Sequence, residues 1–360
     1  MPSDNRLVMI ILRGGMDGLD VVQPYGDKNL AKYRKKLKFG ENAKAHDLDG
    51  FFSLHPALGN LMPLYKTGQL AFAHAVSTPY RNKRSHFDGQ DFLENGGFAT
   101  DASLTAQRDG WLNRLLTLIP NSTASTAYSV GRQRLLILSG DQPTSSWSPD
   151  SDLDLSPQAK LLLERLYKSD ELFANSAKTA FEISQKMDNA MSPARANKAK
   201  SLASFAADRL NEETRIAAFS IGGWDTHRSQ NNSLPRALKE LSDAILTLKT
   251  QLKNNWQKTT ILAMTEFGRT VRENGSSGTD HGTGGVMIMA GGAINGGKIY
   301  GKWPRLGEQD LYQGRDLLPT ADVRSYAASA IADLFSISNS SLENLIFPEL
   351  DLAEKPRFIL

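Results

Sequence analysis

The sequence predicts an α/β protein in which a mostly parallel central sheet is covered on both faces by helices. The predicted strands are continuous apolar runs rather than alternating ones, which is the pattern of strands buried on both faces. Helical patterns separate these runs along the chain, as they do in parallel α/β sheets. At 40% hydrophobic residues, the 360-residue chain also has enough apolar material for a large core.

Five apolar runs are the predicted strands. The first of them, RLVMIIL, has six apolar residues in succession after Arg6. Runs of this length, rich in branched aliphatic residues, are typical of buried strands. The five predicted strands cover residues 6–12, 69–76, 215–221, 259–267 and 285–292.

Two long segments have the periodicity of helices. In residues 233–256, apolar side chains from Leu234 to Leu248 recur at the i, i+3, i+4, i+7 spacing of one helix face. Residues 320–335 form the second predicted helix, with Thr320 as its N-cap because threonine can accept a hydrogen bond from a free backbone N–H.

The stretch 141–213 differs from the rest of the chain. It begins in a loop rich in Pro, Ser and Asp and continues in two helical patterns. We interpret it as a helical insertion or flank that packs within a single domain spanning residues 1–360.

The charge pattern argues against a polyanion-binding protein. The net charge is +3, and the excess is spread over the chain except for the basic run KYRKKLKFG at 32–40. We interpret this run as a solvated loop or helix face, because no aromatic stacking residues or second basic stripe accompany it. No stretch approaches the roughly 20 apolar residues of a membrane span. We therefore expect neither a nucleic-acid partner nor a membrane span.

The absence of cysteine restricts the chemistry that is available to the chain. Disulfides, thiolate nucleophiles and cysteine–metal sites are excluded. Any metal site must use carboxylates and some of the six histidines. Histidine nitrogen with carboxylate oxygen suits Zn, Mn or Fe, whereas carboxylates alone favour Mg or Ca.

Acidic and histidine side chains gather at one predicted edge of the sheet. Loops that leave the carboxyl ends of parallel strands converge there, and ligands bind at that edge. We predict a divalent metal ion, in one or two sites, among these residues: Asp17, Asp225, His227, Glu266, Asp280 and His281.

Each of these motifs also has a structural interpretation. The segments GGMDG and GTDHGTG have the composition of turns, in which Gly and Asp dominate for backbone reasons alone. Glu266 is open to interpretation as a loop acid. It is the repeated placement of imidazoles and carboxylates at successive strand ends that favours the metal site.

Ser85 is the candidate nucleophile, and Arg84 its candidate partner. Ser85 follows a predicted strand and a polar loop and precedes a helical pattern, so its hydroxyl is expected at a helix N-terminus, where anions bind. Arg84 could add a bidentate contact to a phosphate or sulfate. The alternative is that Ser85 is only a helix cap, and a nucleophile at Thr78 or Thr279 stays open.

Several longer motifs together resemble one family. The segments LRGGMDGLDVVQP, RSHFDGQDFLENGG, GGWDTHRSQ and TEFGRTVRENGSSGTDHGTGGVMIMAGG are similar to those of the DUF1501 family of bacterial proteins. That family is grouped with the alkaline phosphatase/sulfatase superfamily. The resemblance covers nearly the whole chain and implies a three-layer α/β/α domain of the alkaline phosphatase type, with a bimetal site and a hydroxyl or thiol nucleophile.

The resemblance also implies roles for individual residues. Asp17 resembles the first metal carboxylate, Ser85 occupies the place of the nucleophile, and Asp225, His227 and His281 resemble ligands of one metal ion. Glu266 falls where phosphatases carry the Asp of an Asp–His pair. The next residue is Phe267, so the second metal ion lacks a histidine ligand, for which Asp280 is available to compensate.

The function expected from the sequence is metal-dependent hydrolysis of phosphate or sulfate esters, with a small-molecule or glycan ester as the substrate. A non-catalytic metal- or anion-binding protein on a degenerate phosphatase scaffold is the main alternative, and a cytoplasmic phosphotransferase of the mutase type is another. Because family members commonly carry a twin-arginine export signal, we expect an exported, periplasmic protein whose leader is absent from this chain.

Overall fold

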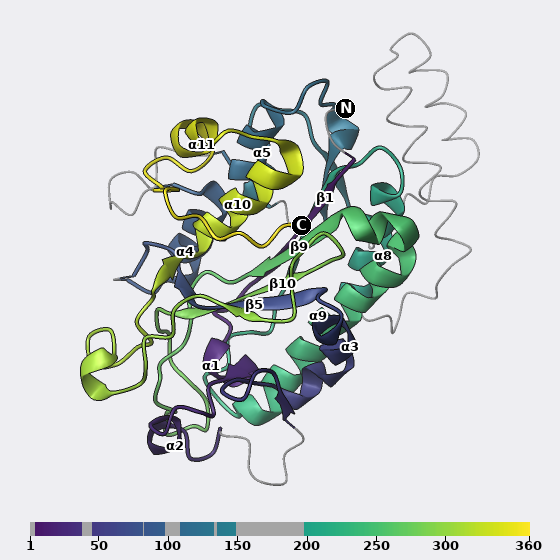
Figure 1. Cartoon of the computed structure of the whole chain (residues 1–360). Helices are drawn as coiled ribbons and strands as arrows, with labels where there is room; N and C mark the ends of the chain where they lie inside the picture. The colour runs from purple at the N-terminus through teal and green to yellow at the C-terminus, as the bar shows by residue number, and fades with distance from the viewer. Residues whose placement is uncertain (1–3, 38–44, 82, 98–108, 133–134, 149–197) are drawn as a thin grey trace.

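The computed structural model describes the chain except for residues 1–3, 38–44, 82, 98–108, 133–134 and 149–197 (Figure 1). Its described residues form a nine-stranded sheet with helices on both sides. All but two of the strand pairs in this sheet are parallel. The predicted fold class is therefore confirmed.

The strands run in the order β11-β5-β10-β9-β1-β8-β6-β7, and β12 pairs with β5. Only β10 is antiparallel to its neighbours β5 and β9. The strands comprise β1 (Arg6–Leu12), β5 (Leu70–Ser77), β6 (Ala127–Val130), β7 (Ser145–Trp147), β8 (Ile216–Ile221), β9 (Thr259–Met264), β10 (Gly285–Ala290), β11 (Ile299–Tyr300) and β12 (Ala321–Asp322).

The central strand β1 shows why the apolar runs are continuous. All seven of its residues are buried. Val8, Ile10 and Leu12 pack into one hydrophobic core, and the alternating residues Leu7 and Met9 pack into a second core on the opposite face. A strand covered on both sides has no solvent face, so it carries no polar alternation.

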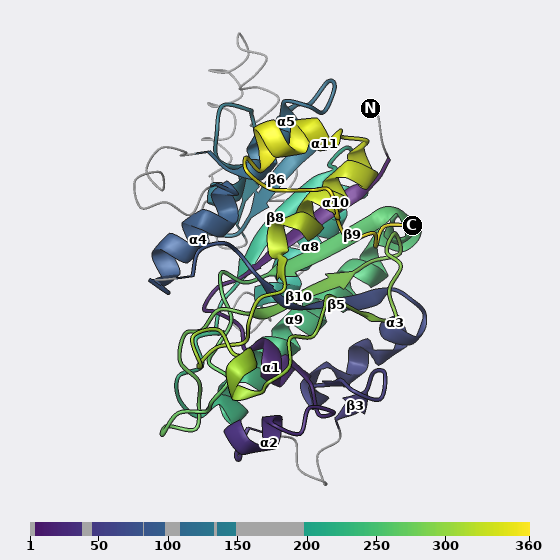
Figure 2. The ribbon, with the colours of Figure 1, turned by 60° about the vertical axis from the view of Figure 1, so that its left-hand side comes forward.

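The two faces are covered by different helices (Figures 1 and 2). Helices α3 (Met62–Lys66), α8 (Lys198–Leu210) and α9 (Gln230–Leu252) contribute to the first core. Helices α5 (Trp111–Leu116) and α10 (Val323–Phe335) contribute to the second. The result is three layers, helix on sheet on helix.

Shorter elements complete the described fold. A small sheet has the order β2-β4-β3 and comprises β2 (Val22–Gln23), β3 (His46–Asp47) and β4 (Ser53–Leu54). The other helices are α1 (Gly18–Val21), α2 (Leu30–Tyr33), α4 (His86–Asn95) and α11 (Asn339–Ser341). Short 3₁₀ segments are η1 (Pro56–Leu61), η2 (Ala124–Thr126), η3 (Leu136–Leu138), η4 (Lys253–Lys258) and η5 (Glu308–Asp310), and η6 (Leu342–Ile346) is a π-helix. Within the described ranges, no helix is long and apolar enough to cross a membrane.

Several boundaries differ from those expected. The predicted strand 259–267 ends at Met264, because the following residues turn into the site at the sheet edge. Asp322, not Thr320, caps α10, and its side chain accepts a hydrogen bond from the Arg324 backbone N–H at 2.9 Å. Strand β7 lies within the predicted loop that begins the 141–213 stretch. Most of that predicted insertion lies outside the described residues, and α8 is its described helix.

Candidate metal centre

Loops from five strands meet at one edge of the sheet. The carboxyl ends of β1, β5, β8 and β9 lie at this edge, because these strands run in the same direction. Strand β10 runs the opposite way, so the loop that precedes it, and not the loop that follows it, comes to the same edge. This explains how His281, which lies before β10, reaches residues that lie after the other strands.

Glycines let the loop after β1 approach the loops after β8 and β9 closely. Gly14 follows β1 with φ +127°, and its N–H donates a hydrogen bond to Glu266 Oε1 at 2.8 Å. A Cβ at Gly14 would lie 2.6 Å from the Asp225 backbone nitrogen. The glycine-rich turn is therefore required by close backbone packing as well as by its conformation.

Glu266 follows β9 and is fully buried. Its Oε1 accepts hydrogen bonds from the Gly14 N–H, from His86 Nδ1 at 2.8 Å and from Gln90 Nε2 at 3.1 Å. Burial alone would raise the pKa of Glu266, but the hydrogen bond from His86 and the further donors outweigh it, so the pKa lies below its ordinary value. Glu266 is therefore an ionised acceptor that holds a histidine ring.

His86 is the first residue of α4, and it is the ring that Glu266 holds. Its pKa is raised, chiefly by the hydrogen bond to Glu266. The ring stacks on Phe267, with centroids 5.0 Å apart. Because Nδ1–H donates to the carboxylate, Nε2 carries the free lone pair of the neutral ring. This Nε2 is buried, has no hydrogen-bond partner among the described residues and lies 3.5 Å from Asp225 Oδ1.

Asp225 and His227 follow β8 through Gly222 and Gly223. Gly223 has φ +91°, and the buried Trp224 donates its indole N–H to the Ile221 carbonyl at 2.9 Å. The glycines thus turn the chain off the strand, and the tryptophan packs the turn onto the core. His227 Nδ1 contacts Asp280 Oδ1 at 3.2 Å, and its Nε2 lies 3.0 Å from Asp225 Oδ1.

His281 comes from the loop before β10. Its Nδ1 donates to the Arg84 carbonyl at 2.8 Å, so Nε2 again carries the lone pair, 3.4 Å from Asp225 Oδ1. Burial, together with the nearby charges of Arg269 and the other histidines, lowers the pKa of His281, although the bond to the Arg84 carbonyl opposes this. The neutral ring is the form that binds metals.

These contacts define a histidine cluster made of His86, Asp225, His227 and His281. Each ring has its Nδ1 held by an oxygen atom and its Nε2 turned toward the same oxygen of Asp225. The Nε2 atoms of His227 and His281 are only 2.9 Å apart. Two neutral rings in these tautomers would place lone pair against lone pair, so this contact requires a proton or a cation.

The donor set and its supports fit a metal ion. Among the described residues, His86, Asp225 and His281 form a group that could hold a metal ion. Metal-binding histidines typically donate their other N–H to a carboxylate or a carbonyl, which fixes the tautomer. Glu266, Asp280 and the Arg84 carbonyl stand in these supporting positions.

Arg269 holds the loops of the cluster together. Its side chain is fully buried and donates to the carbonyls of Gly15, Trp224 and Thr279, and also to Asp225 Oδ1 at 2.6 Å. Burial tends to raise the pKa of Asp225, but Arg269 and then the histidines lower it. Asp225 is therefore a fixed, ionised carboxylate at the centre of the cluster.

Asp17 does not join the histidine cluster. It is fully buried, and Arg34 binds both of its oxygens, at 2.7 and 2.9 Å. Gln230 Nε2 donates to it as well, at 2.6 Å. Arg34 belongs to the basic run that we interpreted as solvated, but its side chain is buried. In this structure Asp17 thus forms a buried ion pair with Arg34 and makes no contact with the histidine cluster among the interactions described.

The other predicted site residues lie around the cluster. Asp280 accepts a hydrogen bond from Asn274 Nδ2 at 3.0 Å and also contacts His227 Nδ1. It therefore supports the His227 ring. The Arg84 guanidinium forms an ion pair with buried Asp316 at 2.9 Å. Arg84 therefore contacts the cluster through its backbone carbonyl, which accepts a hydrogen bond from His281.

Ser85 stands at the N-cap position of α4, directly before His86. Among the described residues its side chain makes no capping hydrogen bond to that helix. The alternative Thr279 donates its hydroxyl to Gln230 Oε1 at 2.8 Å, and the Thr78 hydroxyl is buried. Ser85 is therefore the candidate hydroxyl that lies next to a cluster residue in the chain.

The sequence pattern alone does not assign His86 to the metal set. It directly follows Ser85 in the sequence and begins α4, which makes it a third histidine, beside His227 and His281, at the edge where the strand ends meet. Its partner Glu266 lies 180 positions away, so the pairing has no local signal. The third histidine at this edge was the one feature of the sequence that could have identified His86 as a candidate metal ligand.

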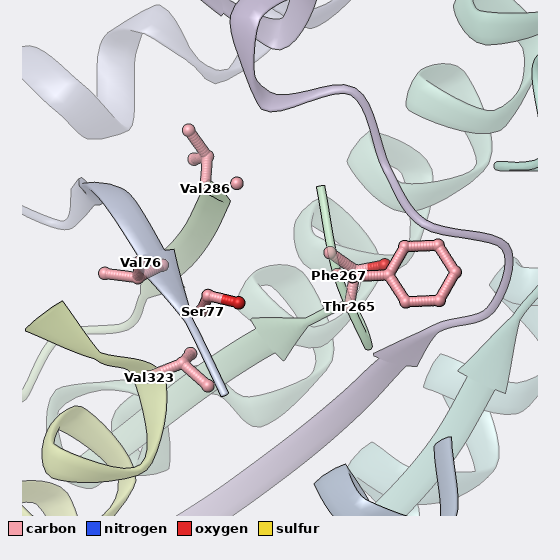
Figure 3. A pocket seen from close by; sticks show the side chains of 7 residues that line it. Val76, Ser77, Thr265, Phe267, Val286 and Val323 are labelled. Carbon is pink, nitrogen blue, oxygen red and sulfur yellow. The ribbon is translucent and has the colours of Figure 1, made fainter. Parts of the chain in front are cut away.

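A small cavity lies behind Phe267 (Figure 3). Its volume is about 10 Å³, and Val76, Ser77 and Thr265 line it together with Phe267. This is room for about one water molecule. The cavity is therefore part of the packing beneath the site and cannot admit a substrate.

The chain belongs to the family described as "Protein of unknown function (DUF1501)", whose profile matches residues 4–346. No curated protein matches the chain.

Solved structures similar to the chain include the C-terminal periplasmic domain of EcEptC from Escherichia coli in complex with Zn. It has 10% identity and a TM-score of 0.49, and the match covers 99% of this chain and 92% of that one. The lipoteichoic acid synthase LtaP from Listeria monocytogenes has 8% identity and a TM-score of 0.43, covering 94% and 73%. A TAB5 alkaline phosphatase mutant with Mg bound has 12% identity and a TM-score of 0.38, covering 83% and 94%.

Proposed function

We propose that this member of the DUF1501 family is a metal-dependent hydrolase of phosphate or sulfate esters that uses one metal ion. The observation that carries the proposal is the histidine cluster, in which three Nε2 atoms face one carboxylate oxygen and each Nδ1 is held by an oxygen acceptor. His86, Asp225, His227 and His281 are the proposed ligands. Nitrogen and carboxylate donors of this kind favour Zn, Mn or Fe over Ca or Mg.

The proposed site is open on one side. The side chains of Asp225 and His227 are 49% and 39% exposed, whereas Glu266 behind them is fully buried. A metal ion held there supplies positive charge to a reacting ester oxygen and lowers the pKa of a hydroxyl beside it. An ester that approaches from solvent can therefore reach the ligands without entering the core.

A single ion is proposed because Phe267 stands where the resemblance implies a ligand of a second one. Its ring packs against His86 and His281, with both centroid distances at 5.0 Å. An aromatic ring offers no lone pair to a metal ion. It instead fixes the planes of two ligands.

Ser85 is the proposed nucleophile. The residues on either side of it are anchored to the site, through the Arg84 carbonyl and the His86 ring. Its oxygen displaces the ester alcohol, which leaves with a proton, and water then releases phosphate or sulfate from the serine. The free N–H groups at the start of the ten-residue α4 favour negative charge beside Ser85. Arg84 is proposed as a positioning residue, since Asp316 holds its guanidinium.

A second candidate function is metal or anion binding without catalysis. Phe267 favours it, because the ligand set of a two-metal phosphatase is incomplete. The hydrolase and metal binding without catalysis both require the metal ion, and they differ in whether Ser85 takes part in turnover of an ester. In either case the proposal includes export to the periplasm, as the family resemblance implies.

The test combines metal analysis with turnover of phosphate monoesters, phosphate diesters and sulfate esters. We expect about one equivalent of metal in the wild type, loss of that metal in His86→Ala and His281→Ala, and metal-loaded but inactive Ser85→Ala. The control Ser338→Ala removes a serine that caps α11 and should keep full turnover. A wild type that binds no metal refutes the proposal. If Ser85→Ala is active, Ser85 is not the nucleophile. If the wild type binds metal but turns over none of the esters, the second candidate function, binding without catalysis, is the one that remains.

A further inference from the structure

Gln230 is the first residue of α9, and both ends of its side-chain amide make two hydrogen bonds. Its Nε2 donates to Asp17 Oδ2 at 2.6 Å and to Asp20 Oδ2 at 2.7 Å. Its Oε1 accepts from the hydroxyls of Thr226 and Thr279, both at 2.8 Å. These four bonds use the full hydrogen-bonding capacity of the amide. Because Gln230 is fully buried, water cannot replace any of these partners.

The acids fix which way the amide of Gln230 faces. Arg34 donates to both oxygens of Asp17, so Asp17 is an ionised acceptor. An ionised carboxylate offers no hydrogen, and therefore the nitrogen end of the amide must face it. The oxygen end is then left for the two threonine hydroxyls. Since Asp20 accepts from Nε2 as well, this orientation does not depend on Asp17 alone.

The two threonines belong to different loops of the histidine cluster. Thr226 lies between Asp225 and His227, and Thr279 lies two positions before His281. Their shared acceptor on Gln230 therefore joins the loop after β8 to the loop before β10. The Thr279 N–H also donates to the Thr226 carbonyl, at 3.2 Å. A shift of one loop against the other would move His227 relative to His281, whose Nε2 atoms are 2.9 Å apart.

We propose that Gln230 is a positioning residue of the metal centre, which holds the two loops at the spacing at which His227 and His281 bind one ion. The inference rests on the proposed function, in which both histidines are ligands. It extends that function to a buried amide that is itself no ligand. Ligands that are already held in place need little further ordering when the ion binds, so the affinity is higher.

Zinc affinity, measured by competition with a chelating dye, tests the role of the two hydroxyls. Thr226→Val/Thr279→Val keeps nearly the same shape but offers Gln230 Oε1 no donor. Zinc should bind about tenfold more weakly to this variant, at the lower end of the range for residues that orient metal ligands. Thr226→Ser/Thr279→Ser keeps both hydroxyls and should keep the wild-type affinity.

Two further variants on α9 complete the set. Gln230→Met removes the whole amide and should lose at least as much zinc affinity. If it does not fold, because Asp17 and Asp20 lose a donor, the threonine variants decide. The control is Ser242→Ala: Ser242 is also fully buried on α9, but it donates to Asn60 Oδ1, at 2.6 Å. This variant should lower the melting temperature and keep the zinc affinity.

The visible spectrum of the cobalt-loaded protein separates positioning from a general loss of stability. The absorption of bound Co²⁺ changes with the number and geometry of its ligands. The valine double variant should therefore differ from the wild type in its cobalt spectrum. Ser242→Ala should have the wild-type spectrum although it is less stable.

The inference is overturned if the valine double variant keeps its zinc affinity or its cobalt spectrum, or if the serine double variant loses as much affinity. Ester turnover by the same preparations separates this inference from the proposed function. Turnover by the wild type together with unchanged zinc binding in the valine variant keeps the hydrolase and refutes the positioning role. Weaker zinc binding and a changed cobalt spectrum in the valine variant, without turnover of any ester by the wild type, keep the positioning role and refute the hydrolase. A wild type that binds no zinc refutes both.

Discussion

Replacing Glu266 with glutamine should weaken metal binding although Glu266 is not a proposed ligand. The Glu266 carboxylate holds the His86 ring through Nδ1 at 2.8 Å, and that bond turns Nε2 toward Asp225. Glutamine keeps nearly the same size but removes the negative charge. Its amide can also present N–H to the His86 ring, which would favour the tautomer with the proton on Nε2.

The expected effect is a 10- to 100-fold loss of metal affinity, which is the range for residues that support metal ligands. This corresponds to about 1.4–2.7 kcal/mol. The loss of a charge-assisted hydrogen bond at a buried site is of similar size, about 1.5–3 kcal/mol. Because Glu266 is fully buried and accepts three further hydrogen bonds, from Gly14, Gln90 and Thr265, solvent cannot replace its charge.

Competition with a chelating dye measures the zinc affinity of Glu266→Gln against that of the wild type. Asp17→Asn is the matched control, since Asp17 is another fully buried carboxylate at the same edge. Asp17 pairs with Arg34, so its variant should lose several kcal/mol of folding stability but keep its zinc affinity. An unchanged zinc affinity in Glu266→Gln, or an equal loss in Asp17→Asn, would refute the assignment of supports and ligands.

Two further predictions concern folding. Burial and the nearby Asp17 raise the pKa of Asp20 to about 7. In the unfolded chain Asp20 ionises at a lower pH than in the folded protein, so the folding stability falls as the pH rises from about 4 to about 7. Asp20→Asn should therefore stabilise the protein against chemical denaturation by an amount that grows through this pH range. A gain that does not depend on pH would contradict this reasoning. Gly14→Ala should destabilise the fold by ~2 kcal/mol more than Gly50→Ala. Both glycines have a positive φ, but a Cβ at Gly14 would lie 2.6 Å from a backbone atom, whereas a Cβ at Gly50 would meet open space. Equal melting temperatures of these two variants would contradict that packing.

The sheet was predictable because its strands are buried on both faces. The run 6–12 coincides with β1, and the run 215–221 differs from β8 by one residue. A continuous apolar run must be buried on all sides, and its short length and branched aliphatic residues favour a strand over a helix. The convergence of the polar loops at one edge follows from the direction of the strands.

The individual partners within the site were not predictable in the same way. Asp17 and Glu266 both follow strands and look alike in sequence, yet one pairs with Arg34 and the other with His86. The choice depends on the path of the chain around Arg34, which buries a cation from a run that looks solvated. Pairings between residues far apart in the chain leave no periodic signal.

The glycine-rich motifs of this chain are turns and site segments at once. Arg269 binds carbonyls on three loops, so the backbones of these loops must lie within reach of one side chain. A Cβ at Gly268 would lie 1.9 Å from the Gly284 carbonyl oxygen, and one at Gly282 would lie 2.4 Å from the Arg269 backbone. Because the backbones of these loops are in contact, the side chains next to the glycines, such as those of the histidine cluster, lie close to one another. Interpreting GTDHGTG as a turn and interpreting it as part of a metal centre are therefore compatible, because the turn brings His281 within 2.9 Å of His227.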